Sequence, residues 1–287
     1  MTAQLAGAHL TPLLVVLVIG AGALHATWNA IAAGVSDRLM AFALIGAAAT
    51  VGGVIAVLLA GMPARGALPY VIASAVIHVG YELALWNSYR IGAFNQTYPI
   101  ARGISPLVVA LGAYVIVGER LGGLPLAGVI ILAAGLMSLA LSSGRLARAD
   151  APAVGAAVLT GLTIASYTIV DGLGVRAAHN PLGYAGLLFA LEGPAFPLIA
   201  VFCRPLSSLR DLPAVGRGLL AGLLSMIAYG VVLWVQVRAP LAEVAAVRET
   251  SVVFAALIGM IFLRERFGAR RVAASLLIAV GIILVAV

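Results

Sequence analysis

One short segment places side chains that can do chemistry on a single face of a helix. His78, Glu82 and Trp86 follow one another at intervals of four residues, and Tyr81 lies beside them. Residues spaced in this way share one side of a helix. A carboxylate between an imidazole and an indole can bind an amine through charge and cation–π attraction, or exchange a proton with it. The alternative is that His78 and Glu82 hydrogen-bond each other and a neighbouring helix.

A second face combines His25, Trp28 and Asn29, which stand at positions i, i+3 and i+4. We expect Trp28 and Asn29 either to line a cavity or to pack and hydrogen-bond between helices. His25, with an unperturbed pKa of about 6.5, is a candidate protonation switch or else a neutral core histidine.

Composition determines which elements must position these residues. Hydrophobic residues make up 63% of the 287 positions and charged residues 9%, against roughly 25% charged residues in ordinary soluble domains. Such a chain cannot cover a globular surface with polar groups, so we predict that it lies in the lipid bilayer. The net charge of +7 is spread over connecting loops, which argues against nucleic-acid binding. The single Cys203 permits no internal disulfide, and the sequence predicts neither a metal site nor a cofactor.

Apolar runs of about twenty residues recur along the chain, the length of helix that crosses roughly 30 Å of hydrocarbon. We therefore expect an all-α membrane protein with ten transmembrane helices. The first run contains His25 and is predicted to be a retained helix rather than a signal peptide. The ten segments are 11–33, 39–60, 67–89, 95–117, 124–142, 152–174, 182–203, 214–237, 241–263 and 269–287.

Two stretches of the chain repeat one sparse pattern of polar residues. Tyr81, Trp86 and Arg90 recur as Tyr229, Trp234 and Arg238, and Arg102 with Glu119 recurs as Arg248 with Glu265. Charged and aromatic residues rarely repeat in register by chance where they are so few. We predict two copies of one five-helix unit, residues 1–148 and 149–287. An odd number of spans inverts the second copy in the membrane, and inverted repeats around a central cavity are a basis of alternating access.

Arg102 and Arg248 occupy equivalent places, each about seven residues and so roughly 10 Å inside its helix. Each arginine is predicted to bind a carboxylate- or phosphate-like group, or to lock a gate. The acidic partners in such a gate would be Glu82, Glu192 or Glu249. The alternative is an anchor that snorkels to the interface. The repeated acids at positions 119 and 265 are expected to be structural, paired with neighbouring arginines.

Two further carboxylates lie in the second copy. Glu192 stands before Gly193 and Pro194 near the middle of its segment, where a kink can free backbone carbonyls, so it is a coupling or substrate residue or a structural one. Alignment of the copies places Tyr167 opposite Trp28, with Asp171 one turn further on. We expect Asp171 either to pair with His25 or to lie at the membrane edge.

Loop arginines indicate the orientation. By the positive-inside rule the richer side is cytoplasmic, which predicts both termini outside the cytoplasm. The richer side carries Arg38, Arg90, Arg145, Arg148, Arg204, Arg210, Arg217, Arg264, Arg266, Arg270 and Arg271, and the poorer side carries Arg65, Arg120, Arg176 and Arg238.

Several segments resemble a known family. They are Pro99-Ile-Ala-Arg-Gly-Ile-Ser-Pro106, Val117-Gly-Glu-Arg-Leu121 and their echoes Val247-Arg-Glu-Thr-Ser-Val and Leu263-Arg-Glu-Arg-Phe267. With ten helices in two halves, they resemble the EamA-type transporters of the drug/metabolite transporter superfamily, and His25-Ala-Thr-Trp-Asn29 is similar to one subgroup. The second copy lacks the two prolines and the Gly-Glu-Arg-Leu ending. The resemblance implies a secondary transporter of small metabolites or drugs without an ATP site. Members are often drawn with both termini in the cytoplasm, opposite to the arginine count.

We therefore predict a secondary active transporter in the inner membrane of the cell, working by proton coupling or exchange, rather than an enzyme. The expected cargo is a small amine-bearing or zwitterionic metabolite, amino acids included, with export as the expected direction, and the protein is expected to be a monomer or weak homodimer. The candidate substrate-binding residues are Trp28, Asn29, His78, Tyr81, Glu82, Trp86, Tyr98, Arg102, Tyr167, Tyr229, Trp234 and Arg248, and the candidate proton-coupling residues are Glu82, His25 and Glu192.

Three alternatives stay open. A polytopic enzyme acting on lipid would gather its polar residues near one membrane face, whereas here they are shared between the copies. A multidrug or cation exporter would use the same carboxylates and aromatic rings. A passive channel would need a continuous polar stripe, and the large aromatic residues argue against a wide pore.

The inverted repeat makes a direct prediction about accessibility. Cysteines introduced as Arg90→Cys and Arg238→Cys, each in a Cys203→Ser background, should react with a membrane-impermeant thiol reagent from opposite sides of the membrane. Arg65→Cys, predicted on the same side as position 238, is the control. Labelling of positions 90 and 238 from one side would contradict the inverted repeat.

Overall fold

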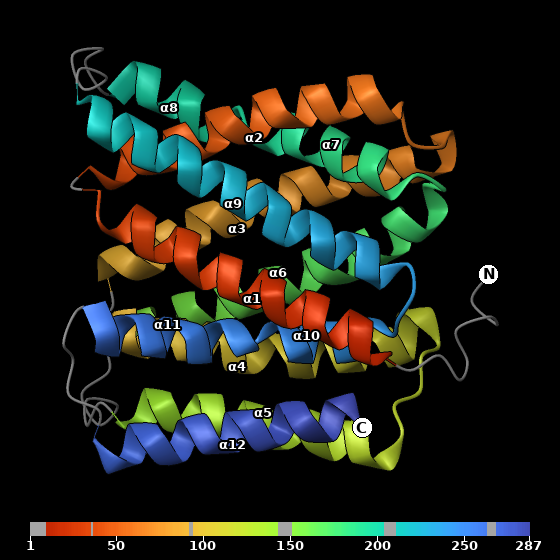
Figure 1. Ribbon diagram of the computed structural model, residues 1–287, viewed down its shortest axis with the longest axis vertical. Coiled ribbons are helices and arrows are strands. Elements are labelled where there is room, and N and C mark those ends of the chain that lie inside the picture. The colour runs from red at the N-terminus through yellow and green to blue at the C-terminus, as the bar shows by residue number, and fades with distance from the viewer. Residues whose placement is uncertain (1–9, 36, 92–93, 143–150, 204–210, 263–267) are drawn as a thin grey trace.

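The computed structural model describes residues 10–35, 37–91, 94–142, 151–203, 211–262 and 268–287. Within these ranges every regular element is a helix, and the helices form one bundle in which most run roughly along a common direction (Figure 1). The elements of the first half are α1 (Pro12–Ala33), α2 (Arg38–Ala60), the short 3₁₀ helix η2 (Arg65–Ala67), α3 (Leu68–Ile91), α4 (Phe94–Gly112), the π-helical turn η3 (Ala113–Val117) and α5 (Gly123–Ser142). Those of the second half are α6 (Ala151–Ala177), α7 (Pro181–Glu192), α8 (Ala195–Cys203), α9 (Leu212–Gln236), α10 (Leu241–Arg248), α11 (Thr250–Phe262) and α12 (Ala269–Ala286).

Eight helical stretches of the described chain are long and apolar enough to cross a membrane, by length and composition. They coincide with the first eight predicted segments. The ninth, 241–263, is divided between α10 and α11, and the tenth contains a shorter apolar helix over residues 272–286. The protein is therefore a multi-pass membrane protein, and the full count of ten spans stays a prediction.

Short polar residues fix the starts of several spans. Side-chain oxygens of Thr11, Asp37, Asn180 and Asp211 each accept a hydrogen bond from the backbone N–H three residues later. Proline stands in the first turn of α1, α7 and α9, where its missing N–H costs no helical bond. These caps satisfy backbone donors at the edge of the apolar spans.

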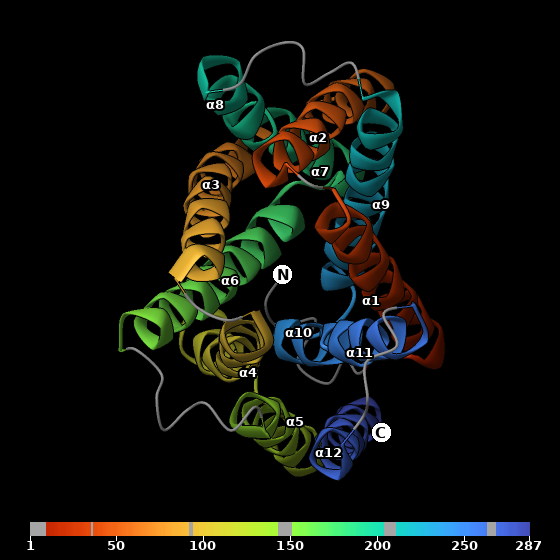
Figure 2. The ribbon, with the colours of Figure 1, turned by 90° about the vertical axis from the view of Figure 1, so that its left-hand side faces the viewer.

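Helix packing keeps the same pattern when the two halves are exchanged. α3 packs along α6 as α9 packs along α1, and α4 packs on α6 as α10 and α11 pack on α1. Two further large contacts, α2 with α7 and α5 with α12, each join one half to the other. Figure 2 shows α3 and α6 on one side of the bundle, with α1 and α9 on the other.

The close approach of α2 to α7 depends on glycine. A Cβ atom added to Gly53 would lie 2.5 Å from the carbonyl oxygen of Gly186, and one added to Gly193 would lie 2.7 Å from that of Gly46. The two backbones are therefore in contact, as is common where small residues line a membrane helix interface. This contact brings the end of α7, with Glu192, against the middle of α2.

A network around Arg176 joins the two halves at the end of the bundle where α6 and α9 finish. Its Nη1 donates to Glu119 Oε1 (2.7 Å), Nε to the Gln236 carbonyl (2.9 Å) and Nη2 to the Ala239 carbonyl (2.9 Å). Oε2 of Glu119 accepts from the N–H of Leu241 (2.7 Å). The predicted pairing of Glu119 with an arginine is thus confirmed, while its repeat partner Glu265 lies outside the described residues.

Further hydrogen bonds join the halves at the same end. The Asn180 side chain donates to the Ala60 carbonyl (2.8 Å), and the N–H of Ala64 donates to the Ala178 carbonyl (3.1 Å). Oε2 of Glu243 accepts from the N–H of Leu10 (3.2 Å). Helices from both halves are therefore cross-linked around this end.

We expect Arg176→Ala to destabilise the protein, because it leaves the buried Glu119 carboxylate without its cation. Breaking a buried ion pair typically costs about 3–5 kcal/mol, so the thermal unfolding temperature in detergent should fall clearly. The control is Arg238→Ala, which removes an exposed arginine that bonds to its own helix at the Trp234 carbonyl. Equal, small shifts for both variants would show that the Arg176 network does not hold the halves.

Candidate functional site

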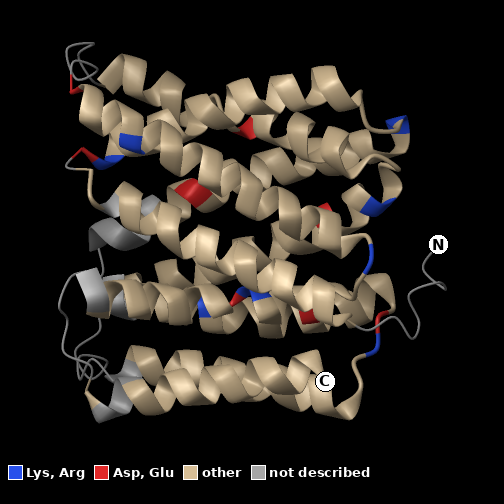
Figure 3. Ribbon diagram, viewed as in Figure 1, with Lys and Arg blue, Asp and Glu red and all other residues tan. Residues whose placement is uncertain are grey.

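Charged residues occur inside the apolar bundle as well as at its ends (Figure 3). The first buried group centres on Asp171 of α6, whose accessible surface is 0%. The Tyr184 hydroxyl, from α7, donates to Asp171 Oδ1 (2.8 Å), and the Tyr229 hydroxyl, from α9, donates to Oδ2 (2.5 Å). Asp171 therefore holds three helices together through its two oxygens.

His78 of α3 lies between two carboxylates. Its Nε2 is 4.0 Å from Asp171 Oδ2, and its Nδ1 is 3.5 Å from Glu192 Oε2. Nδ1 also lies 3.0 Å from the Ser74 carbonyl and 3.1 Å from the Ser74 hydroxyl. The imidazole stacks on the Tyr167 ring, with centroids 4.0 Å apart. Because each ring nitrogen faces an acid, His78 can exchange a proton with either side.

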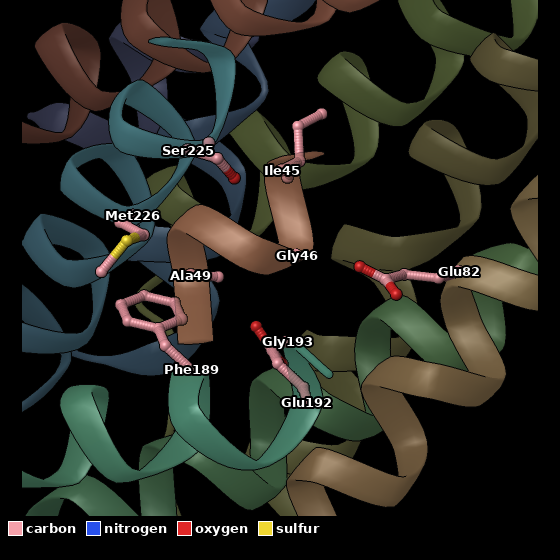
Figure 4. Close-up of a pocket in the computed structure, with 10 residues that line it drawn as sticks. Ile45, Gly46, Ala49, Glu82, Phe189, Glu192, Gly193, Ser225 and Met226 are labelled. Carbon is pink, nitrogen blue, oxygen red and sulfur yellow. The ribbon is translucent and has the colours of Figure 1, made fainter. Parts of the chain in front are cut away.

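Glu82 of α3 and Glu192, the last residue of α7, both direct their carboxylates into a small pocket between α2, α3, α7 and α9 (Figure 4). Gly46 and Ala49 of α2 form one wall, and Phe189 forms part of another. The Oε2 atom of Glu192 is buried and forms no hydrogen bond with the described residues. The pocket therefore presents two acidic groups in an otherwise mostly apolar lining.

A second buried group joins α4 to the junction of α10 and α11. Arg102 Nε lies 3.2 Å from Glu249 Oε2, and Arg102 Nη2 donates to the Ser251 hydroxyl (2.7 Å). The guanidinium carbon is 5.6 Å from the centre of the Tyr98 ring. Arg102 and Glu249 are both buried, and Glu249 is one of the three carboxylates named as possible partners of the arginines. A gate-locking role for the pair stays a prediction.

The ninth predicted segment is interrupted at Glu249. The N–H of Glu249 donates to the carbonyls of Ala246 and Val247, which ends α10, and α11 begins at the next residue. Discontinuous helices in transporters commonly place binding groups near the middle of the membrane. Here the interruption places Arg248 and Glu249 beside α4 and α1, on which α10 packs.

Aromatic rings surround His78 beside Asp171. The Tyr167 ring stacks on His78, and its centre lies 5.9 Å from that of Tyr229. The Tyr81 ring lies 5.4 Å from that of Tyr167 and extends the aromatic wall.

On α1, the predicted face is built around His25. Trp28 Nε1 donates to His25 Nδ1 (3.3 Å), and Asn29 Nδ2 donates to the His25 carbonyl (2.8 Å). Trp28 is buried against Ile45 and Ala221. The expected pairing of Asp171 with His25 is wrong, because both Asp171 oxygens accept hydrogen bonds from tyrosines. The alternative placement of Asp171 at the membrane edge stays a prediction.

Trp234, one of the two repeated tryptophans, lies at the surface of the bundle rather than with the buried groups. Trp234 is 39% exposed and lies under the guanidinium of Arg238, 3.6 Å from the ring centre, at the end of α9. It therefore stands apart from the cluster that contains Asp171. The side chain of Trp86 lies outside the described part of the structure.

Sequence reasoning did not select Asp171, Tyr184 or Ser251 as site residues. Asp171 lies one turn after Tyr167, but its partners come from α7 and α9. No pattern within the sequence of α6 indicates these contacts. Tyr184 lies in the first turn of α7, four residues after the capping Asn180, where an aromatic residue more commonly marks the membrane interface.

The two tyrosines that bind Asp171 should contribute more to the stability of the protein than a tyrosine without a buried hydrogen-bond partner. Tyr184→Phe and Tyr229→Phe each remove a hydrogen bond to a buried carboxylate, which should cost about 1–3 kcal/mol of stability. Thermal unfolding in detergent should show this, with the exposed Tyr114→Phe as a control. A Tyr229→Phe protein as stable as the control would contradict the role given to this bond.

Comparison with known proteins agrees with this architecture. Residues 151–287 match the model of the EamA-like transporter family. A solved crystal structure superposes with a TM-score of 0.75 at 18% sequence identity, covering 94% of this chain and 97% of that chain. This likeness shows the fold alone, and it extends over both halves. No curated protein sequence matches. The second half of the chain, residues 151–287, is thus similar to the EamA-like transporter family.

Proposed function

We propose that the protein is a secondary active transporter that moves a small amine-bearing or zwitterionic metabolite, amino acids included, by alternating access. The observation that carries this proposal is that acidic, basic and aromatic side chains from both halves of the chain are buried together inside an apolar bundle. An ionisable residue at the centre of a membrane helix costs about 2.5–3.5 kcal/mol on insertion scales. Such residues generally line a substrate or ion pathway.

The pocket between Glu82 and Glu192 suits the cationic end of the substrate. Both carboxylates point into it, and Glu192 Oε2 is buried without a hydrogen-bond donor among the described residues. Asp171 is a weaker candidate because two tyrosine hydroxyls already occupy its oxygens. An ammonium group in the pocket would supply donors to both glutamates.

The same geometry suggests how transport is coupled. An ammonium ion and a proton compete for Glu192, so release of one favours uptake of the other. His78 can deliver the proton, since it lies between Glu192 and Asp171. Tyr167 and Tyr229 also face its ring, and the charge of Arg248 acts on it.

Alternating access would follow from the two inverted units, residues 1–148 and 149–287, which the exchange of helix contacts between the halves supports. The network around Arg176 and Glu119 then closes one end and must open in the other state. Export across the inner membrane, with the arginine-rich end in the cytoplasm, completes the proposal.

Counterflow in proteoliposomes tests this function. Vesicles loaded with an unlabelled amine or amino acid should take up the labelled compound, and Glu82→Gln and Glu192→Gln should abolish uptake. Glu243→Gln, a substitution of a buried glutamate outside the pocket, should retain it. A panel that includes bulky quaternary cations separates this proposal from a multidrug exporter, which would prefer them to amino acids.

The pH dependence of counterflow tests the proposed proton coupling through His78. Wild-type counterflow should change between about pH 5 and pH 8, the range in which histidine titrates, and any residual transport by His78→Gln should not. Full transport by Glu82→Gln, or an unaltered pH profile in His78→Gln, would overturn the mechanism.

A further inference from the structure

The two arginines at equivalent positions of the repeat have different surroundings. Arg102 is neutralised by Glu249 and donates to Ser251. Arg248 is equally buried, with 4% of its surface accessible, but its Nε and Nη2 atoms bond to no group in the described part of the chain. A buried charge without a partner is costly, so this guanidinium lacks an acceptor that a ligand can supply.

The unpartnered atoms have a specific geometry. Nε and Nη2 lie on one edge of the planar guanidinium, where their N–H bonds run nearly parallel. This edge matches the two oxygens of a carboxylate and gives a bidentate pair. Since Glu249 lies within ion-pair distance of Arg102, the group Arg102, Arg248 and Glu249 carries one uncompensated positive charge when the glutamate is ionised. One monoanion would balance it.

Arg248 ends a helix that packs against the helices of the site, because α10 contacts α1, α4, α6 and α9. Three of these helices carry His25 (α1), Tyr167 (α6) and Tyr229 (α9). The rings of Tyr167 and Tyr229 pack against His78 of α3. His78 in turn lies beside Glu192, which opens into the acidic pocket. His78 therefore connects the aromatic residues on the helices next to α10 with the acidic pocket.

We propose that Arg248 binds the carboxylate of the substrate, while Arg102 is a structural arginine held by Glu249. This inference rests on the proposed transport function and narrows its substrate class to zwitterions, with the ammonium group at Glu82 and Glu192 and the carboxylate at Arg248. The repeat positions are therefore equivalent in sequence but not in role.

Matched probes test the assignment in proteoliposomes containing the full chain. The panel consists of the standard amino acids and, for each, the amine that lacks the carboxylate and the acid that lacks the amino group. We expect amino acids to be exchanged, and Arg248→Gln to reduce their exchange at least about tenfold. Arg248→Lys, which keeps the charge but loses the bidentate edge, should recover part of the activity. Simple amines should be weak substrates, equally weak in wild type and Arg248→Gln.

A second measurement uses the wild-type protein and does not depend on how the variant folds. The deaminated acid should inhibit amino-acid exchange by competition and should raise the thermal unfolding temperature in detergent, since a ligand that binds the folded state stabilises it. Inorganic phosphate and a phosphonate analogue form a further arm; preferential inhibition by either would overturn the assignment to a carboxylate.

The outcomes separate the two proposals. Exchange of amines as efficient as that of amino acids, with no inhibition by the acid, would overturn the role of Arg248 and leave the transport function in place. Absence of exchange for every probe, in a protein that unfolds cooperatively, would overturn the proposed function itself. Arg102→Gln should instead lower the unfolding temperature, because it strands the buried Glu249.

Discussion

The fold depends on one constraint: an ionised side chain inside hydrocarbon must find a partner inside the protein. In this chain the partners come from opposite halves. Arg102 meets Glu249, His78 lies between Asp171 and Glu192, and the Arg176 guanidinium contacts Glu119. Each half alone would leave costly charges exposed to lipid. Polar pairing therefore supplies the specificity of assembly that apolar surfaces cannot give, since lipid is as apolar as the helices.

Much of this arrangement was accessible from the sequence. The apolar runs predicted the first eight spans closely, because length and hydrophobicity decide insertion into a bilayer. The spacing of His78 and Glu82 correctly indicated a polar helix face. The repeat that aligns Arg102 with Arg248 predicted that both arginines lie inside the bundle, and both are buried in the structure.

What the sequence did not predict depends on contacts between distant helices. The partners of Asp171 lie on α7 and α9. The interruption at Glu249 is a single turn residue, and neither of its neighbours, Arg248 and Thr250, is a proline or a glycine. Symmetry was also misleading, because Arg102 and Arg248 are equivalent in register yet only one has Glu249 as its partner. Equivalent positions in a repeat share a place in the bundle, whereas their chemistry depends on the particular neighbours.

The burial of the ion pairs that join the halves has a consequence for the environments in which the protein can work. Dissolved ions screen exposed charges over a Debye length of about 8 Å at physiological ionic strength, and they screen buried pairs much less. Arg102 with Glu249 and Arg176 with Glu119 are shielded from solvent. Changes in salinity should therefore loosen the attraction of basic loops for anionic headgroups while leaving the union of the two halves intact.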